Sequence, residues 1–154
     1  MHLADLISPE AVIPALKAKT KKQLLQELSA RAARVTGLQE RYIFDTLLQR
    51  ERLGSTGLGQ GIAIPHGKFA GLKRIVGIFA RLAEPIDFEA VDGDPVDIVF
   101  LLLAPDSAGA DHLKALARIS RLLREGRAVD KLRASKDASA LYAVLTEEAT
   151  PHAA

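Results

Sequence analysis

The sequence contains no cysteine and no tryptophan, and it has only two tyrosines and five phenylalanines among its 154 residues. Without cysteine, neither a disulfide nor a thiolate metal site can form, and such a composition suits a reducing compartment. Aromatic side chains are the platforms on which unpaired bases stack, so their scarcity argues against binding of single-stranded nucleic acid. The composition therefore leads us to expect a cytoplasmic protein that binds no nucleic acid.

Long apolar runs and an excess of one charge are also missing. No stretch of about 20 uninterrupted apolar residues, as a membrane span would need, is present, and no basic leader precedes such a run at the N-terminus. The formal net charge is only +2, and acidic residues are interspersed with basic ones, so the sequence shows no dense basic stripe. We expect neither secretion nor membrane insertion.

Histidines at metal-ligand spacing are absent as well. The four histidines stand at positions 2, 66, 112 and 152, with no short ligand spacing and no adjacent cluster of carboxylates. A metal site is therefore not expected, and each histidine has to be considered singly.

The length of the chain suits one compact domain. A chain of 154 residues with 48% hydrophobic and 26% charged residues is of ordinary size and composition for a single globular domain with its own core. No repeat, low-complexity tract or linker divides it. We expect one domain over residues 1–150 and a short C-terminal tail over residues 151–154.

The apolar pattern predicts alternating helices and strands. A short helix is expected from Ser8, and helical spacing of apolar residues predicts longer helices over about 21–36, 40–52, 111–125 and 136–148. Strands are expected over about 12–17, 62–64 and 75–82. The run from Val96 to Ala104 is almost continuously apolar, so it predicts a strand that is buried on both faces and covered by helices on both sides. The expected fold class is α/β, a single-domain mixed β-sheet sandwiched by α-helices.

One short stretch is unusually rich in glycine. Residues 50–68 read RERLGSTGLGQGIAIPHGK, which resembles two phosphate-binding loops without matching either. A Walker A loop does not fit, because five residues instead of four separate Gly61 from Gly67, and Phe69 occupies the position of the magnesium-binding hydroxyl. A dinucleotide fingerprint needs a strand before it, whereas here a helix is expected. The serine elbow of a hydrolase is missing too.

His66 is the residue of this stretch that could carry chemistry. A neutral imidazole has one nitrogen lone pair free near physiological pH, so a histidine can accept a phosphoryl group and later release it. Arg50, on the last turn of the preceding helix, could offer a forked pair of donors to the phosphoryl oxygens. Nearby hydroxyls and glycine amides could form an anion-binding nest, for which the candidates are Ser55, Thr56, Gly57 and Gly67. From these residues alone, a plain turn histidine in a glycine loop stays equally open.

The same stretch closely resembles the phosphorylation-site segment of a known family. The family is the enzyme IIA proteins of the fructose-mannitol class (type 2) in the bacterial phosphoenolpyruvate-dependent phosphotransferase system, and the stretch is most similar to their nitrogen-regulatory branch. Its core, GIAIPHG, is the most specific part. The resemblance extends over nearly the whole chain, through residues 18–37, 84–105 and 111–123. It implies the fold of the phosphotransferase/anion-transport proteins.

The resemblance also implies a function. His66 would be the phosphoacceptor, modified at Nε2 as a tele-phosphohistidine, with Arg50 assisting and His112 as a second histidine nearby. No metal, nucleotide or other cofactor would be needed. The donor would be a histidine phosphocarrier of the HPr type, called NPr in the nitrogen branch. The protein would be a phosphotransferase component with a regulatory role, and its partners would include potassium-transport and sensor proteins.

Two alternatives remain open at this point. The protein could be a sugar-specific enzyme IIA of the fructose or mannitol type, which passes its phosphoryl group to a IIB domain. It could also be a binding module, in which His66 is dispensable. The final phosphoryl acceptor does not follow from the sequence.

Overall fold

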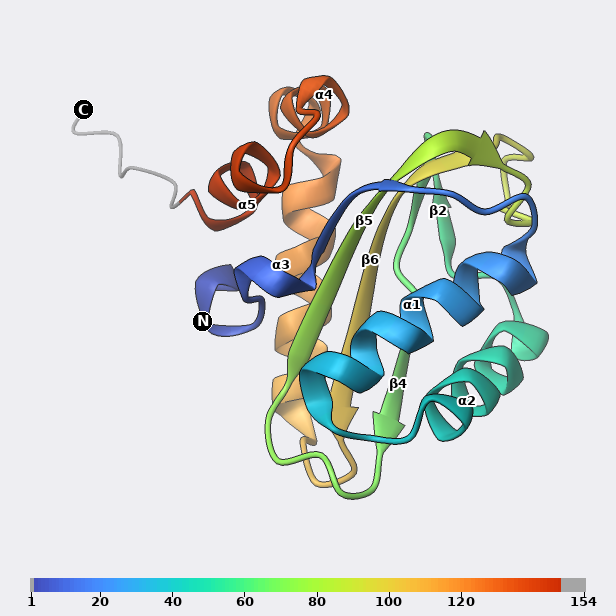
Figure 1. Ribbon diagram of the computed structural model, residues 1–154, viewed down its shortest axis with the longest axis vertical. Helices are drawn as coiled ribbons and strands as arrows, with labels where there is room; N and C mark the ends of the chain where they lie inside the picture. The colour runs from blue at the N-terminus through green and yellow to red at the C-terminus, as the bar shows by residue number, and fades with distance from the viewer. Residues whose placement is uncertain (1, 148–154) are drawn as a thin grey trace.

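Thirteen short and long elements make up the described part of the chain, which a computed structural model defines over residues 2–147 (Figure 1). The expected tail, residues 151–154, lies outside this range. In chain order the elements are η1 (Leu3–Asp5), η2 (Pro9–Ala11), β1 (Val12–Leu16), α1 (Lys21–Thr36), α2 (Glu40–Leu53), β2 (Gly57–Gly59), β3 (Ile62–Ala63), β4 (His66–Phe69), β5 (Val76–Ile86), β6 (Val96–Pro105), α3 (Ala110–Arg124), α4 (Gly126–Ala134) and α5 (Ala138–Thr146).

The six strands form one mixed sheet. Its order is β1-β5-β6-β3-β2, and β4 also pairs with β6. Strand β6 runs antiparallel to β5 but parallel to β3 and β4, which lie along its other edge. The outermost strands are β1, which carries Pro14 in its middle, the three-residue β2 and the four-residue β4. The apolar run of β6 is thus central, and residues 98–105 are all buried, as the sequence predicts.

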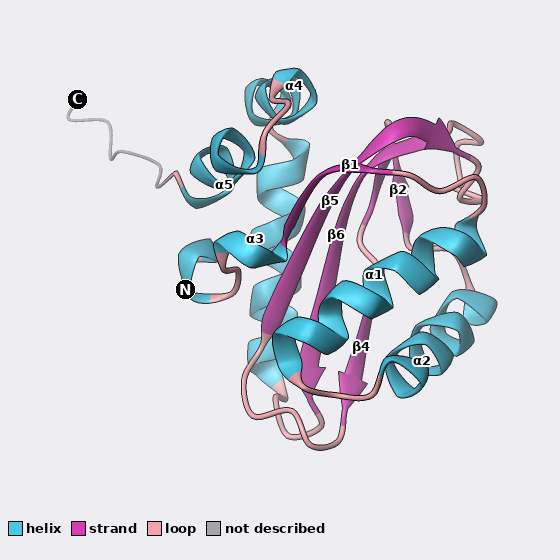
Figure 2. Cartoon of the chain, in the orientation of Figure 1, coloured by secondary structure: helices cyan, strands magenta, loops and turns pink. Residues whose placement is uncertain are grey.

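Helices cover both faces of this sheet. Figure 2 shows α1 and α2 on one face and α3 on the other, with α4 near one end of the sheet and α5 beside β1. Between the layers lie fully buried aromatic side chains such as Phe79 and Phe100, whose rings meet edge to face with centroids 6.3 Å apart. Each buried side chain of this size stabilises the fold by roughly 1.5–3 kcal/mol. The expected α/β sandwich is confirmed, and within residues 2–147 no helix is long and apolar enough to cross a membrane.

Local sequence signals set the ends of α1. The Thr20 side chain caps the helix by accepting a hydrogen bond from the Gln23 amide at 3.1 Å, and Gly37 ends it in the left-handed conformation at φ 78°. The residues Thr20 to Gln23 have the spacing of a capping box, but the Gln23 side chain accepts from the amide of Lys19 instead of the amide of Thr20.

Two parts of the fold differ from the sequence expectation. The helix expected over about 111–125 is followed directly by a further helix, α4, which begins at Gly126 after a short extended step at Glu125. Arg133 of α4 holds this helix to the start of β6 through a forked hydrogen bond to Asp97, with Nε 3.0 Å from Oδ2. The glycine-rich stretch is also not a plain loop, because it contains the antiparallel pair β2 and β3. Neither β2 nor β4 has the alternating apolar pattern by which a strand is recognised in sequence.

Candidate functional site

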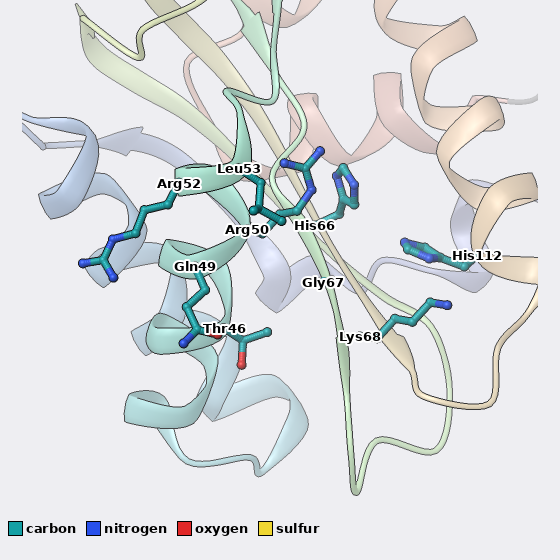
Figure 3. A pocket seen from close by; sticks show the side chains of 9 residues that line it. All are labelled: Thr46, Gln49, Arg50, Arg52, Leu53, His66, Gly67, Lys68 and His112. Atoms are coloured by element: carbon teal, nitrogen blue, oxygen red, sulfur yellow. The ribbon is translucent and has the colours of Figure 1, made fainter.

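A pocket of about 640 Å³ opens between α2, the start of β4 and the first turn of α3. Figure 3 shows His66 at its centre, with the guanidinium of Arg50 on one side and His112 on the other. Three residues that are up to 62 positions apart in the sequence (112 − 50) therefore share one pocket, as the sequence analysis expected. The complete lining consists of Thr46, Gln49, Arg50, Arg52, Leu53, His66, Gly67, Lys68 and His112.

The central strand of the sheet holds His66 in place. His66 is the first residue of β4 and lies opposite Leu102 of the buried strand β6 in parallel register. The residue before it, Pro65, has no N–H to donate, but its carbonyl accepts a hydrogen bond from the Leu102 amide at 2.9 Å. The half-buried imidazole is therefore presented from a rigid backbone and not from a loop.

A backbone hydrogen bond fixes the tautomer of His66. Its Nδ1 lies 2.8 Å from the carbonyl oxygen of Ile64. Because a carbonyl oxygen can only accept, Nδ1 must carry the proton and donate it. The other ring nitrogen, Nε2, then holds the free lone pair, and it makes no hydrogen bond to any of residues 2–147. The arrangement leaves Nε2 as the nucleophilic atom of the pocket.

His112 is the second imidazole of the pocket and is almost buried, with 8% of its surface exposed. Its ring centroid lies 5.7 Å from that of His66, at an interplanar angle of 61°. Its buried Nε2 has no hydrogen-bond partner among the residues that the structure describes. Burial lowers the pKa of His112 below the ordinary 6.5, and electrostatic interactions with His66 and Lys68 lower it further. His112 is therefore neutral at physiological pH.

This lowered pKa should make the stability of the protein depend on pH near 6.5. Since the unfolded chain binds a proton at position 112 more readily than the folded protein does, the free energy of unfolding should fall as the pH is lowered through 6.5. Denaturant titrations at several pH values test this. His112→Gln should flatten this pH dependence, whereas His2→Gln, which lies outside the pocket, should retain it. A midpoint for His112 at or above 6.5 in an NMR titration would contradict the expectation.

Positive charge gathers on the open side of His66. Nη1 of Arg50 donates a hydrogen bond to the carbonyl oxygen of Gly54 at 3.0 Å. Figure 3 shows the guanidinium of Arg50 beside the imidazole of His66. Lys68, which the sequence analysis missed, lines the same pocket two residues beyond His66. Side chains two apart on a strand share a face, so a prediction of β4 would have found it. The pocket thus suits an anion with several oxygens.

Three of the predicted phosphate-binding residues lie outside the pocket lining. The Ser55 hydroxyl donates to the Phe88 carbonyl at 3.0 Å and accepts from the Gly57 amide at 3.1 Å. Thr56 is buried, and both its hydroxyl and its amide donate to the carboxylate of Glu51. Gly67, the fourth candidate, does line the pocket. Glu51 is not among the site residues predicted from the sequence, and a direct role of Ser55, Thr56 and Gly57 in phosphate binding stays a prediction.

Gly57 has a packing reason for its missing side chain. A Cβ atom at this position would lie 2.8 Å from the Cβ and 3.0 Å from the Cα of Ala90. We expect Gly57→Ala to lower the free energy of unfolding by about 1–3 kcal/mol, the usual cost of overpacking, in urea denaturation. Gly126→Ala is the matched control, because a Cβ there would meet nothing within 4 Å in the described structure and alanine favours a helix. Equal unfolding free energies for the two variants would contradict the packing argument.

Comparisons with known proteins agree on one family. A family model described as "Phosphoenolpyruvate-dependent sugar phosphotransferase system, EIIA 2" matches residues 5–148. A nitrogen regulatory protein of Bradyrhizobium diazoefficiens is 63% identical over 145 residues, which cover 94% of this chain and 95% of the relative. The crystal structure of the nitrogen regulatory protein IIA-Ntr of Neisseria meningitidis superposes with a TM-score of 0.88 at 35% identity, covering 94% of this chain and 99% of that one. A fructose-specific EIIABC component of Bacillus subtilis is more distant, with 33% identity over 124 residues, 80% of this chain and 20% of the larger protein.

Proposed function

The chain belongs to the type 2 enzyme IIA family of the phosphoenolpyruvate-dependent phosphotransferase system, among its nitrogen-regulatory members, and we propose that His66 accepts and passes on a phosphoryl group. The observation that carries the proposal is the hydrogen bond from Nδ1 of His66 to Ile64, because it leaves the Nε2 lone pair free at the pocket. A regulatory role is favoured over sugar transport, since a nitrogen regulatory protein is 63% identical to this chain and the fructose-specific EIIABC component only 33%.

The proposed reaction moves one phosphoryl group between two imidazoles. The lone pair on Nε2 of His66 attacks phosphorus, a new N–P bond forms, and the N–P bond to the histidine of the donor carrier breaks as its electron pair returns to the carrier nitrogen. The proton on Nδ1 stays in place throughout. Its hydrogen bond to the Ile64 carbonyl stabilises the positive charge that the ring gains on phosphorylation. The transfer needs no metal ion and no nucleotide.

The residues around His66 would stabilise the charge on the phosphoryl oxygens. Arg50 and Lys68 supply positive charge from α2 and β4, and His112 lies in the first turn of the 15-residue helix α3, near the positive end of its dipole. We propose that His112 assists by hydrogen bonding without itself carrying phosphate. A phosphoryl dianion at His66 would place negative charge close to His112 and favour the protonated form of its imidazole. Phosphorylation should therefore raise the pKa of His112.

Phosphate uptake from a purified relay tests the proposed function. The protein is incubated with labelled phosphoenolpyruvate, enzyme I and an NPr-type carrier, and phosphate that is labile in acid but stable in base is measured. We expect one such phosphate on each protein molecule, formed only when the carrier is present. Failure of the wild-type protein to take up phosphate from a phosphorylated carrier would overturn the proposal.

The family implies a phosphocarrier as a partner, and the rim of the pocket offers a surface for it. Leu53 of α2 lines the pocket, and Leu113 follows the pocket residue His112 in α3; their surfaces are 85% and 68% exposed. Four basic residues follow Leu113 along α3 at helical spacing and have no ionic partner within residues 2–147: Lys114, Arg118, Arg121 and Arg124. Apolar residues separate them in the sequence, which hides this stripe from a linear inspection. We propose that the carrier docks here through an apolar centre with an acidic surround.

Charge reversal within this stripe should weaken docking without harming the chemistry. We expect Arg121→Glu to raise the KM for the phosphorylated carrier several-fold while kcat stays nearly constant, because a rim charge acts mainly on encounter. The effect should shrink at high ionic strength. Arg34→Glu on α1, which covers the opposite face of the sheet, is the matched control. If both variants had the same KM, the basic stripe would have no part in docking.

We further propose that the phosphorylation state of His66 regulates target proteins, with potassium-transport and sensor proteins as the candidates. Cells that carry a His66→Gln protein in place of the wild type, grown at limiting potassium, test the first of these. We also propose that the protein is located in the cytoplasm. The domain is proposed to extend over residues 1–150.

A further inference from the structure

Glu51 is a buried acidic side chain that the proposed mechanism does not use. It follows Arg50 in the last turn of α2, yet only 3% of its side chain is exposed, and it does not line the pocket. Carboxylates are almost never this buried unless they are paired, because the charged form loses its hydration. Its position next to Arg50 and its burial together call for a role.

The carboxylate of Glu51 closes the turn that follows α2. Oε1 accepts hydrogen bonds from the Thr56 amide at 3.0 Å and from Lys21 Nζ at 3.0 Å, while Oε2 accepts from the Thr56 hydroxyl at 2.6 Å. Lys21, the first residue of α1, also lies 4.5 Å from the centroid of the Phe88 ring. The turn from residue 51 to residue 56 is therefore fixed to two other parts of the fold.

Arg50 is anchored on this same turn. Its Nη1 donates to the carbonyl oxygen of Gly54 at 3.0 Å, and the Gly54 amide in turn donates to the carbonyl of Glu51 at 3.1 Å. Gly54 lies within the turn that the hydrogen bonds between Glu51 and Thr56 close. The position of the Gly54 carbonyl therefore depends on this closed turn. A guanidinium that has lost this anchor can take up other rotamers and no longer presents its fork to one point in the pocket.

We propose that Glu51, acting through Thr56 and Gly54, is a positioning residue that holds Arg50 in the orientation needed for phosphoryl transfer. The proposal rests on the proposed function, because it assigns Glu51 a part in the same reaction. Under this proposal the residues of the glycine-rich stretch have different roles. His66 reacts, while Thr56 fixes the turn that contains Gly54, whose carbonyl holds Arg50.

A double-mutant cycle tests whether Glu51 acts through Arg50. Transfer from a phosphorylated carrier is measured for wild type, Glu51→Gln, Arg50→Ala and the double variant. We expect Glu51→Gln to lower kcat by about tenfold, which is less than the loss of about 10²-fold for complete removal of a charge-assisted donor, with little change in the KM for the carrier. In the Arg50→Ala background the same change should cost nothing further. A purely structural residue would lower the rate by the same factor in both backgrounds.

Thr56 provides a second and milder route to the same test. Thr56→Val removes the hydroxyl that Glu51 accepts from but keeps the volume, whereas Thr56→Ser keeps the hydroxyl. We expect the valine variant to reproduce the loss seen in Glu51→Gln and the serine variant to transfer phosphate much closer to the wild-type rate. These variants decide the question if Glu51→Gln does not fold, which denaturant titration of each protein would reveal.

An NMR readout separates failure of this inference from failure of the proposed function. The Arg50 Nε–H resonance, assigned by its loss in Arg50→Lys, should shift or broaden in Glu51→Gln and in Thr56→Val, whether or not the protein takes up phosphate. An unchanged Arg50 resonance, or equal rate losses in the two backgrounds of the cycle, would overturn the positioning role. Absence of phosphate uptake by the wild type, with the resonance shifted as expected, would overturn the phosphoryl-transfer role and leave only the anchoring of Arg50.

Discussion

His66→Gln is expected to take up no phosphate from the phosphorylated carrier, the largest effect of any single substitution in this chain. Glutamine has a similar reach and keeps a hydrogen-bond donor, but its amide nitrogen has no lone pair available for attack on phosphorus. The rate should fall below detection, because the acceptor atom itself is lost. Single-turnover labelling from purified carrier, followed by acid and base treatment of the product, measures the effect.

Two further histidine variants make this result specific. His2→Gln should take up phosphate at the wild-type rate, because position 2 is remote in the chain from the pocket residues and does not line the pocket. His112→Gln should still be labelled, although more slowly, since we assign His112 an assisting role. Full labelling of His66→Gln, or phosphate mapped to His112 in the wild type, would show that the acceptor has been assigned to the wrong residue.

Arg50→Ala is expected to slow phosphoryl transfer by about 10²-fold or more while the protein stays folded. Removal of one oriented, charge-assisted donor typically costs this much at a site where charge develops in the transition state. Arg50→Lys should recover only part of the loss, because an ammonium group is a point charge without the planar fork of the guanidinium. The loss should be in kcat, and rapid-quench kinetics with saturating phosphorylated carrier can measure it.

Arg41→Ala is a suitable control for the arginine experiment. Arg41 lies on the first turn of the same helix, its side chain is 87% exposed, and its ion pair with Asp45 is of the exposed kind that contributes little to stability. This variant removes the same charge from α2 while leaving the pocket intact. If Arg41→Ala and Arg50→Ala slowed transfer equally, a general loss of positive charge, and not the orientation of Arg50, would explain the effect.

The sequence predicts most of this fold through its apolar spacing. The buried strand Val96–Pro105 follows from its almost continuous apolar run, and the helices α1, α2, α3 and α5 follow from their periodic apolar patterns. Helix α4 was not predicted, since the glycine at its start, Gly126, is of the residue type that usually follows a helix. Strand β4 was missed because HGKF has only one large apolar residue. Backbone pairing with β6 forms that strand, and pairing partners are not visible in a single sequence.

The candidate site, too, could be predicted only where the local sequence carries the signal, and not where the fold decides which residues meet. The resemblance of the glycine-rich stretch indicated His66, Arg50 and His112, and the pocket brings them together. Closeness in sequence suggested Ser55 and Thr56 as phosphate ligands, yet their hydroxyls bond to Phe88 and Glu51. The stretch between them and His66 first turns back through β2 and β3, so chain neighbours of the histidine are directed elsewhere. Only the folded backbone distinguishes the two outcomes.

The position of β6 in the middle of the sheet also affects how the protein avoids aggregation. Its apolar, β-branched sequence is the kind of segment that forms intermolecular cross-β stacks when it is exposed. In the native fold β5 pairs along one edge of β6, and β3 and β4 pair along the other. The sheet ends in β2, with three residues, in β4, with four, and in β1, which contains Pro14. Short or proline-bearing margins are poor templates for a second chain. Damage that opens the sheet would therefore endanger solubility through β6 even where the chemistry of the pocket is intact.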